Sequence, residues 1–193
     1  ETIQAGNLYV NRGTTGAITL RQPFGGMGKS ALGPAIKAGG PNYVAQFMDF
    51  AETDAPRVGA LQKESALLRM ALEWRRKLLW GQLGPYAGDL RKTIRAVQSY
   101  LYHWEQEFGV AKDYFHLRGQ DNLHRYRPLS AIAVRVHPAD ALFEVLARIA
   151  AVRVTGSVPV VSLPEGLHNA ATAFLETVEG REILGGAVVR RQS

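Results

Sequence analysis

The sequence predicts an α/β protein in which a small parallel sheet follows a pair of helices. Between residues 67 and 108, apolar residues recur at spacings of three and four, which is the period of amphipathic helices. From residue 130 onward, short β-branched runs alternate with helical stretches in the order β-α-β-α-β, which indicates parallel strands joined by crossovers. The chain has 193 residues, of which 46% are hydrophobic, so it can form a core.

Residues 1–50 predict an irregular, glycine-rich segment. Glycine and proline recur between Pro23 and Pro41, which is typical of a long shaped loop. Residues 7–11 have the composition of a short strand, and residues 43–50 are apolar again and favour either a strand or a short helix.

Residues 67–78 and 90–108 predict two helices. A glycine- and proline-containing turn at residues 81–85 separates them, so we expect an antiparallel helical hairpin. The second helix has one apolar stripe, formed by Leu90, Ile94, Val97, Leu101, Trp104 and Phe108. The tryptophans lie among leucines at helical spacing, and we expect all of them in the core: Trp74, Trp80 and Trp104.

The last third of the chain predicts a small, Rossmann-like parallel sheet. We expect strands at residues 131–136, 158–163 and 185–190, and helices at 138–153 and 167–178. Pro138 would open the first of these helices. Proline has no N–H, and the first N–H groups of a helix have no partner within the helix, so nothing is lost there. Its apolar face is Leu142, Val145, Leu146 and Ile149. The expected division is therefore an irregular segment (1–50), a helical hairpin with a connector (51–129) and an α/β domain (130–193).

The glycine motifs do not complete a phosphate site. Residues 25–30 end in Gly-Lys-Ser, but Pro23 stands where a phosphate loop needs a glycine. Residues 26–31 fit the loose dinucleotide fingerprint, yet they follow a turn rather than a strand. The turn after residues 131–136 contains no glycine, and Asp140 would place a negative charge where an anion would bind.

Composition excludes other kinds of site. The absence of cysteine excludes disulfides, zinc-thiolate sites and a cysteine nucleophile, and it favours the cytoplasm. The five histidines lack metal-ligand spacing, so we expect no metal site. The sequence contains no run of eighteen apolar residues, so it predicts no membrane span. The net charge of +6 is spread over helix faces beside carboxylates, so we expect no nucleic-acid partner.

Three segments at residues 6–12, 22–26 and 37–41 carry a resemblance to a known family. Together they resemble the end of the dehydrogenase domain in 1-pyrroline-5-carboxylate dehydrogenases, which belong to the aldehyde dehydrogenase superfamily. The likeness is greatest to the form in bacterial bifunctional proline-utilisation enzymes. Residues 119–129 and 134–140 resemble, less specifically, a tail that some of these enzymes carry, which looks like a degenerate nucleotide-binding half.

The resemblance implies oxidation of glutamate γ-semialdehyde to glutamate with NAD. It implies that Thr15, Gly16 and Ala17 hold the substrate's α-carboxylate through backbone N–H groups, and that Phe24 lines the aldehyde pocket. The family's catalytic cysteine, general-base glutamate and nucleotide-binding segments match nothing in this chain. The chain is therefore expected to supply no catalytic, cofactor-binding or metal-binding residue, and NAD would belong to the parent enzyme.

These observations predict the C-terminal part of an NAD-dependent 1-pyrroline-5-carboxylate dehydrogenase that is not active by itself. Its expected partner is the rest of the dehydrogenase domain, and for residues 1–50 we expect either a homo-oligomer or elevated mobility. The alternative is a non-catalytic oligomerisation, lid or interaction domain of a larger enzyme. The chain opens at Glu1 rather than Met, so we expect a piece of something longer.

Overall fold

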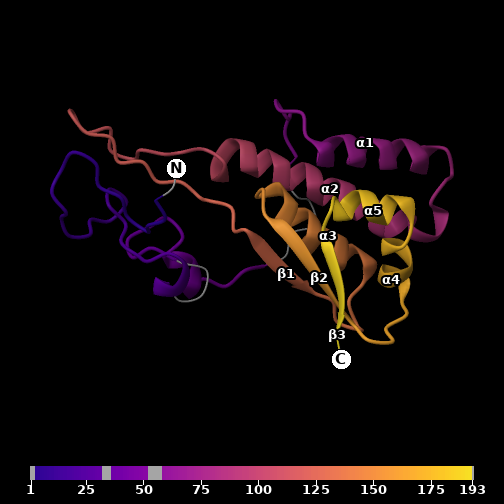
Figure 1. Cartoon of the computed structure of the whole chain (residues 1–193). Coiled ribbons are helices and arrows are strands. Elements are labelled where there is room, and N and C mark those ends of the chain that lie inside the picture. Colours follow the sequence, from indigo (N-terminus) through magenta and orange to yellow (C-terminus); the bar gives the residue numbers. More distant parts are fainter. Residues whose placement is uncertain (1–2, 32–35, 52–57, 193) are drawn as a thin grey trace. The chain divides into compact units, whose positions relative to one another are not determined.

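The computed structural model describes residues 3–31, 36–51 and 58–192 and has two compact units (Figure 1). The N-terminal unit comprises residues 1–53 together with residues 111–124, and the helix–sheet unit comprises residues 54–110 and 125–193. In Figure 1 the N-terminal unit consists mainly of irregular loops, whereas the helix–sheet unit holds the long helices and the sheet. Residues 111–124 thus belong to the same unit as residues 1–53, although the two segments are far apart in the sequence.

The helix–sheet unit contains the predicted parallel sheet. Its strands are β1 (Ala131–Arg135), β2 (Val158–Pro164) and β3 (Val188–Gln192), in the spatial order β1-β2-β3. All neighbouring strands are parallel, with Ala131 opposite Val158 and Val160 opposite Val188. β3 begins three residues later than predicted, because Gly185 takes a left-handed conformation (φ 56°) and ends the preceding helix. The α/β fold class is confirmed.

The helix α3 (Leu142–Val154) begins later than the predicted start at Pro138. Residues 137–140 instead form a turn, in which the Asp140 carboxylate accepts the main-chain N–H of His137 at 2.8 Å. Arg148 donates to both oxygens of the same carboxylate, at 2.7 and 2.9 Å, and so secures the turn. The predicted apolar face of the helix is confirmed, since its members are all buried: Leu142, Val145, Leu146 and Ile149.

The single helix predicted over residues 167–178 is wrong. The structure has α4 (Ala170–Leu175) and α5 (Val178–Leu184). Asn169 caps the start of α4 by accepting from the N–H of Thr172, and Thr177 caps the start of α5 by accepting from Gly180. The Thr177 hydroxyl also donates to the carbonyl of Phe174 at 2.6 Å, so one side chain ends the first helix and begins the second.

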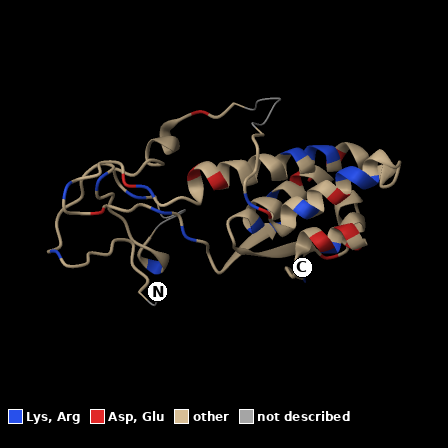
Figure 2. Cartoon of the chain, turned by 90° about the horizontal axis from the view of Figure 1, so that it is seen from above, with Lys and Arg blue, Asp and Glu red and all other residues tan. Residues whose placement is uncertain are grey.

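The predicted helical hairpin is present as α1 (Ala66–Leu79) and α2 (Ala87–His103), connected through a 3-10 turn at Gly84–Tyr86. α2 continues into a π-helical turn at Trp104–Phe108. The apolar stripe is buried over its first four members and emerges at Phe108, which is 39% exposed. Figure 2 shows basic and acidic residues mixed along the outer surfaces of the two helices, as expected of solvated faces.

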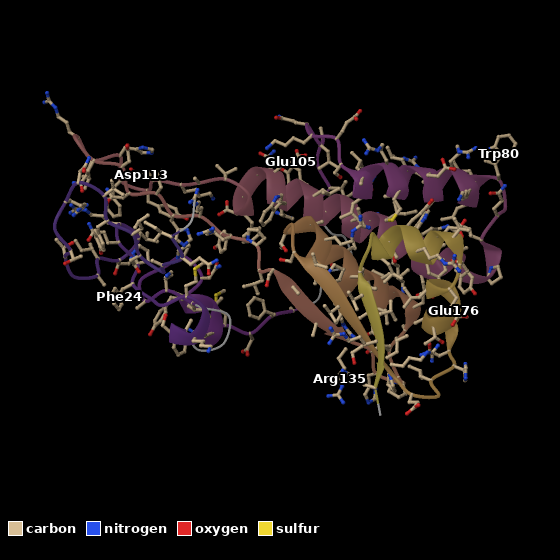
Figure 3. The ribbon with its side chains drawn as sticks, viewed as in Figure 1. Phe24, Trp80, Glu105, Asp113, Arg135 and Glu176 are labelled. Carbon is tan, nitrogen blue, oxygen red and sulfur yellow. The ribbon has the colours of Figure 1, made fainter. Side chains whose placement is uncertain are left out.

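The prediction that all tryptophans lie in the core is wrong for Trp80, and Trp104 is only half-buried. Trp74 is fully buried, but Trp80 is 74% exposed and lies at the end of the hairpin (Figure 3). Trp80 follows the last residue of α1, where the helix ends and the chain turns. Helical spacing therefore placed Trp74 correctly, because that residue is inside the helix.

Aromatic contacts connect the hairpin to the short helices. The ring of Phe174 in α4 meets Trp74 edge-on at 5.6 Å and Tyr86 at 5.0 Å between centroids. The indole N–H of Trp74 donates to Glu182 at 3.2 Å, and Lys77 pairs with Glu179 at 3.0 Å. α1 is thus held against α5 by polar contacts at the border of an aromatic core.

We predict that Gly180→Ala lowers the free energy of unfolding by about 1–3 kcal/mol. A Cβ at residue 180 would overlap the main chain of Phe174 and Leu175, which cannot move as a side-chain end can. Gly88→Ala in α2 is the control, because nothing lies within 4 Å of its Cβ position. That change should stabilise the protein by up to about 1 kcal/mol. Urea unfolding measures both, and an equal effect of the two substitutions would contradict the packing described here.

We also predict an acid-dependent contribution from Asp140. The hydrogen bonds from Arg148 lower the pKa of Asp140 to about 2. A carboxyl whose pKa is below its unfolded value of about 3.9 stabilises the fold above that value and loses the effect as the pH falls toward 2. Asp140→Asn should therefore cost about 1–2 kcal/mol at neutral pH, and the difference from wild type should shrink between about pH 4 and pH 2. Unfolding at several pH values tests this, with the exposed Glu165→Gln of the same unit as control.

Candidate functional site

Lys37 organises the N-terminal unit by capturing main-chain carbonyl groups. Its ammonium donates to the oxygens of Gly6 (2.7 Å), Gly25 (2.6 Å) and Gly26 (3.4 Å). Burial lowers the pKa of Lys37 from its usual value. One side chain thereby joins the beginning of the unit to the segment that precedes the 3-10 turn at Gly28–Ser30.

Asn7 supplies a second tie in the same place. Its amide nitrogen donates to the carbonyl of Pro23 at 2.8 Å, and its amide oxygen accepts from the N–H of Gly25 at 3.2 Å. The strand predicted over residues 7–11 is wrong, because the side chain of Asn7 makes the pairing that a strand's main chain would make. Residues 43–50 contain a 3-10 helix at Val44–Phe47, so the short-helix alternative is the correct one there.

Two antiparallel bridges hold the predicted substrate residues. Ile18 and Gln22 exchange main-chain hydrogen bonds of 3.2 and 2.8 Å around a left-handed Leu20, and Phe24 and Ala38 exchange bonds of 3.0 and 2.8 Å. Thr15, Gly16 and Ala17 are exposed immediately before the first bridge, and Phe24 is 58% exposed within the second. Figure 3 shows the Phe24 side chain on the loops of this unit.

A polar cluster lies behind Thr15 and Gly16. We call Arg12, Arg21, Gln22 and Gln120 the loop-support cluster. Arg12 donates to the side-chain oxygen of Gln120 at 2.8 Å, and Arg21 donates to the same oxygen at 3.3 Å. Gln22 is only 6% exposed, although its side chain is polar. A buried amide must be hydrogen-bonded, and here its neighbours determine which way it points.

The guanidinium of Arg12 can only donate, so the Gln22 atom that faces it must be the amide oxygen. That oxygen accepts from Arg12 at 2.8 and 3.1 Å. The amide nitrogen then donates to the Thr15 hydroxyl oxygen at 2.7 Å and to the carbonyl of Gly16 at 3.2 Å. Gln22 consequently connects an arginine to two of the residues predicted to hold substrate.

Gln120 comes from residues 111–124, which form a closed loop of their own. The Asp113 carboxylate accepts the N–H groups of Asn122 (2.9 Å), Phe115 (3.0 Å) and His116 (3.1 Å), and these bonds lower the pKa of Asp113. Lys112 and His124 close the loop through reciprocal main-chain bonds of 2.8 Å. Sequence reasoning missed Gln120, and only the Asp113 turn had a local signal, an aspartate whose side chain can bond main-chain N–H groups two and three residues later.

The main-chain N–H groups of Gly16 and Ala17 donate no hydrogen bond within the described part of the chain. The carbonyl of Thr15 accepts from the Tyr9 hydroxyl at 3.4 Å, so the opposite side of the loop is engaged. Exposed N–H donors on small residues can hold a carboxylate. The structure thus brings Thr15, Gly16 and Ala17 together as an open donor surface, whose role stays a prediction.

The turn between β1 and α3 does not fit the pyrophosphate of NAD. The turn between β1 and α3 is where a dinucleotide fold would bind pyrophosphate. Here the Asp140 carboxylate already takes the N–H of His137 and adds a negative charge at that position. Among residues 3–31, 36–51 and 58–192, no group of three or more histidine, cysteine, aspartate or glutamate side chains could hold a metal ion. No helix in the same ranges is long and apolar enough to cross a membrane.

Comparison with known proteins connects the chain to proline catabolism. The bifunctional protein PutA of Rhizobium meliloti is 44% identical over 69 residues, which are 36% of this chain and 5% of that protein. The 1-pyrroline-5-carboxylate dehydrogenase of Bacillus thuringiensis (strain Al Hakam) is 56% identical over 48 residues, which are 25% of this chain and 9% of that protein. No protein-family model matches the chain.

A solved structure extends the likeness to both units. Proline Utilization A (PutA) from Corynebacterium freiburgense matches 100% of this chain with a TM-score of 0.59 and 30% sequence identity. The chain is homologous to part of PutA and of 1-pyrroline-5-carboxylate dehydrogenase. The resemblance predicted from the sequence is therefore confirmed, and the helix–sheet unit also has a counterpart in a PutA. The chain spans only 5%, 9% and 19% of these relatives, so it corresponds to a small part of each.

We predict that Lys37→Met loosens residues 5–26. Removing the ammonium leaves carbonyl groups without their donor, at a cost of about 2 kcal/mol. Amide hydrogen exchange should accelerate in residues 5–26, while the core of the helix–sheet unit should keep its protection. The control is Lys29→Met, since Lys29 is exposed in the Gly28–Ser30 turn. Equal exchange in both variants would show that Lys37 is not the organising side chain.

Proposed function

We propose that this chain is the C-terminal part of an NAD-dependent 1-pyrroline-5-carboxylate dehydrogenase, in which it holds the substrate but performs no chemistry. The observation that carries the proposal is the homology to 1-pyrroline-5-carboxylate dehydrogenase and PutA. The open N–H donors of Gly16 and Ala17 support it, because glutamate γ-semialdehyde has an α-carboxylate for them to bind. The helix–sheet unit would then be a structural extension of the enzyme.

Phe24 completes the proposed binding surface. Its main chain forms the second bridge with Ala38, and its side chain is exposed. A flat apolar ring suits the aliphatic chain that separates the carboxylate from the aldehyde of the substrate. Thr15, Gly16, Ala17 and Phe24 would thus hold opposite ends of one small molecule.

The rest of the dehydrogenase is the proposed partner. The N-terminal unit exposes large apolar side chains, including Val10 (69%), Phe47 (76%) and Phe50 (80%). Contiguous patches of exposed apolar side chains mark protein interfaces, and we propose that these residues belong to one. The same residues would serve a homo-oligomer, and the alternative of a non-catalytic assembly or lid domain uses the same surface without any substrate.

The reacting groups would come from the partner. This sequence contains no cysteine, so the thiolate that attacks the aldehyde must belong to another part of the enzyme, together with NAD. We further propose a cytoplasmic location, and we keep residues 1–50, 51–129 and 130–193 as the proposed functional divisions of the chain.

The test is an assay of the longest natural polypeptide that contains these 193 residues. We expect it to reduce NAD with glutamate γ-semialdehyde, and we expect the 193 residues alone to be inactive. Ala17→Pro removes one N–H donor and should raise KM for this substrate about tenfold. Propionaldehyde, which has no carboxylate, should be used about equally by both forms. Absence of turnover in the wild-type polypeptide would reject the enzyme and favour the assembly domain.

A further inference from the structure

We propose that Gln22 is a positioning residue that aims the donors of residues 15–17, and that Gln120 completes its support through Arg12 and Arg21. The inference rests on the proposed function, because it takes residues 15–17 to be the holder of the substrate's carboxylate. It assigns a role to residues 111–124, which lie outside the segment with the strongest likeness to the dehydrogenases.

The first step concerns the peptide unit between Gly16 and Ala17. In a trans peptide the C=O and the following N–H point in opposite directions. Gln22 donates to the carbonyl of Gly16 at 3.2 Å, so the N–H of Ala17 points away from Gln22. The bond made on the buried side therefore sets the direction of a donor on the exposed side.

The neighbouring peptide unit is held in the same manner. The Tyr9 hydroxyl donates to the carbonyl of Thr15 at 3.4 Å, which turns the N–H of Gly16 away from Tyr9. The guanidinium of Arg12 lies over the Tyr9 ring at 5.6 Å from its centroid, so Arg12 contacts both tying residues. Two consecutive N–H groups are thus directed by bonds to the carbonyls behind them.

The Thr15 hydroxyl supplies a third donor. Its oxygen accepts from the Gln22 amide nitrogen at 2.7 Å. A hydroxyl that accepts a hydrogen bond still has its own hydrogen to donate. Thr15, Gly16 and Ala17 then have three hydrogens available to donate, and two of these depend directly on Gln22.

Charge favours an anion at the same place. Arg12 and Arg21 both donate to Gln120, which is neutral, and neither forms an ion pair with a carboxylate in the described part of the chain. The Nε of Arg21 is buried and makes no hydrogen bond there. Within the described residues, the two guanidinium charges near the loop are therefore not neutralised by a carboxylate, and they attract a substrate that carries one.

Gln120 makes the positions of Arg12 and Arg21 depend on residues 111–124 of the same unit. It accepts from both arginines at once, and the Asp113-centred loop holds residues 111–124 closed. Without the Gln120 oxygen, the two like charges would have no shared acceptor, and Arg12 would lose one of the contacts that keep it on Gln22. The support thus runs from Gln120 through Arg12 and Gln22 to residues 15–17.

The experiment uses the full natural polypeptide with Gln22→Leu, Gln120→Leu and, as control, Gln4→Leu, whose residue is exposed in the same unit. The first two changes should raise KM for glutamate γ-semialdehyde about tenfold, while kcat/KM for propionaldehyde stays within about twofold. Gln22→Glu keeps an acceptor for Arg12 but has no N–H to donate, so it should raise KM as Gln22→Leu does. An equal loss with both aldehydes would overturn the proposal, because it indicates general damage.

A second readout separates this inference from the proposed function. Backbone order parameters of Gly16 and Ala17 in the full natural polypeptide should be about 0.85 in wild type and below about 0.6 in Gln22→Leu and Gln120→Leu. If these values fall but the wild-type polypeptide does not oxidise glutamate γ-semialdehyde, the positioning role is supported and the proposed function fails. Unchanged order parameters in either variant would overturn the positioning role, whatever the enzyme assay shows.

Discussion

The N-terminal unit depends on one constraint, which is that main-chain polar groups away from solvent need hydrogen-bond partners even where no helix or sheet supplies them. Residues 3–31 and 36–51 contain short 3-10 turns and isolated bridges rather than long ladders. Side chains take over the pairing. Lys37 binds carbonyl groups of Gly6, Gly25 and Gly26, and the amide of Asn7 pairs with residues 23 and 25. The same solution recurs at Gln22, so the shape of the open loop before it is a product of side-chain bonds.

The helix–sheet unit meets the same constraint with regular elements and uses side chains only where these end. Asn169 and Thr177 cap the short helices, and Arg153 donates to the carbonyls of Glu182 and Ile183 at the end of α5, both at 2.8 Å. Burial lowers the pKa of Arg153, yet its guanidinium stays paired with these carbonyl groups. Apolar packing around Phe174 then holds the elements together. One unit is thus stabilised mainly by its core, and the other by polar ties.

This difference decides how much could be predicted from the sequence. Period and composition were sufficient for the hairpin, the parallel sheet and the buried face of α3, because burial leaves a repeating pattern. They failed where one side chain overrides the pattern, as Asp140 does before α3 and Thr177 does between α4 and α5. They failed at residues 7–11 for the same reason. Thr15, Gly16, Ala17 and Phe24 were identified through a family resemblance. Gln120 lies in the segment that resembles the family's tail, but nothing there indicated its contacts with Arg12 and Arg21, because these partners are about 100 residues away and only folding brings them together.

A loop that presents main-chain donors to a ligand has to solve a mechanical problem. Its N–H groups must stay unbonded until the ligand arrives, so they cannot help to hold the loop in shape. Only the carbonyl groups on the opposite side are left to fix the loop by hydrogen bonds, and in this chain Tyr9 and Gln22 donate to them. A support of this kind needs buried polar side chains that are themselves fully paired, since a half-satisfied amide would rotate and release the loop. In this chain the buried amide is Gln22, whose oxygen accepts from Arg12 and whose nitrogen donates to Thr15 and Gly16, and Arg12 in turn donates to Gln120. The proposed binding surface and its proposed support therefore come from distant parts of the sequence, and on this proposal substitutions in residues 111–124 alter a site that they never touch.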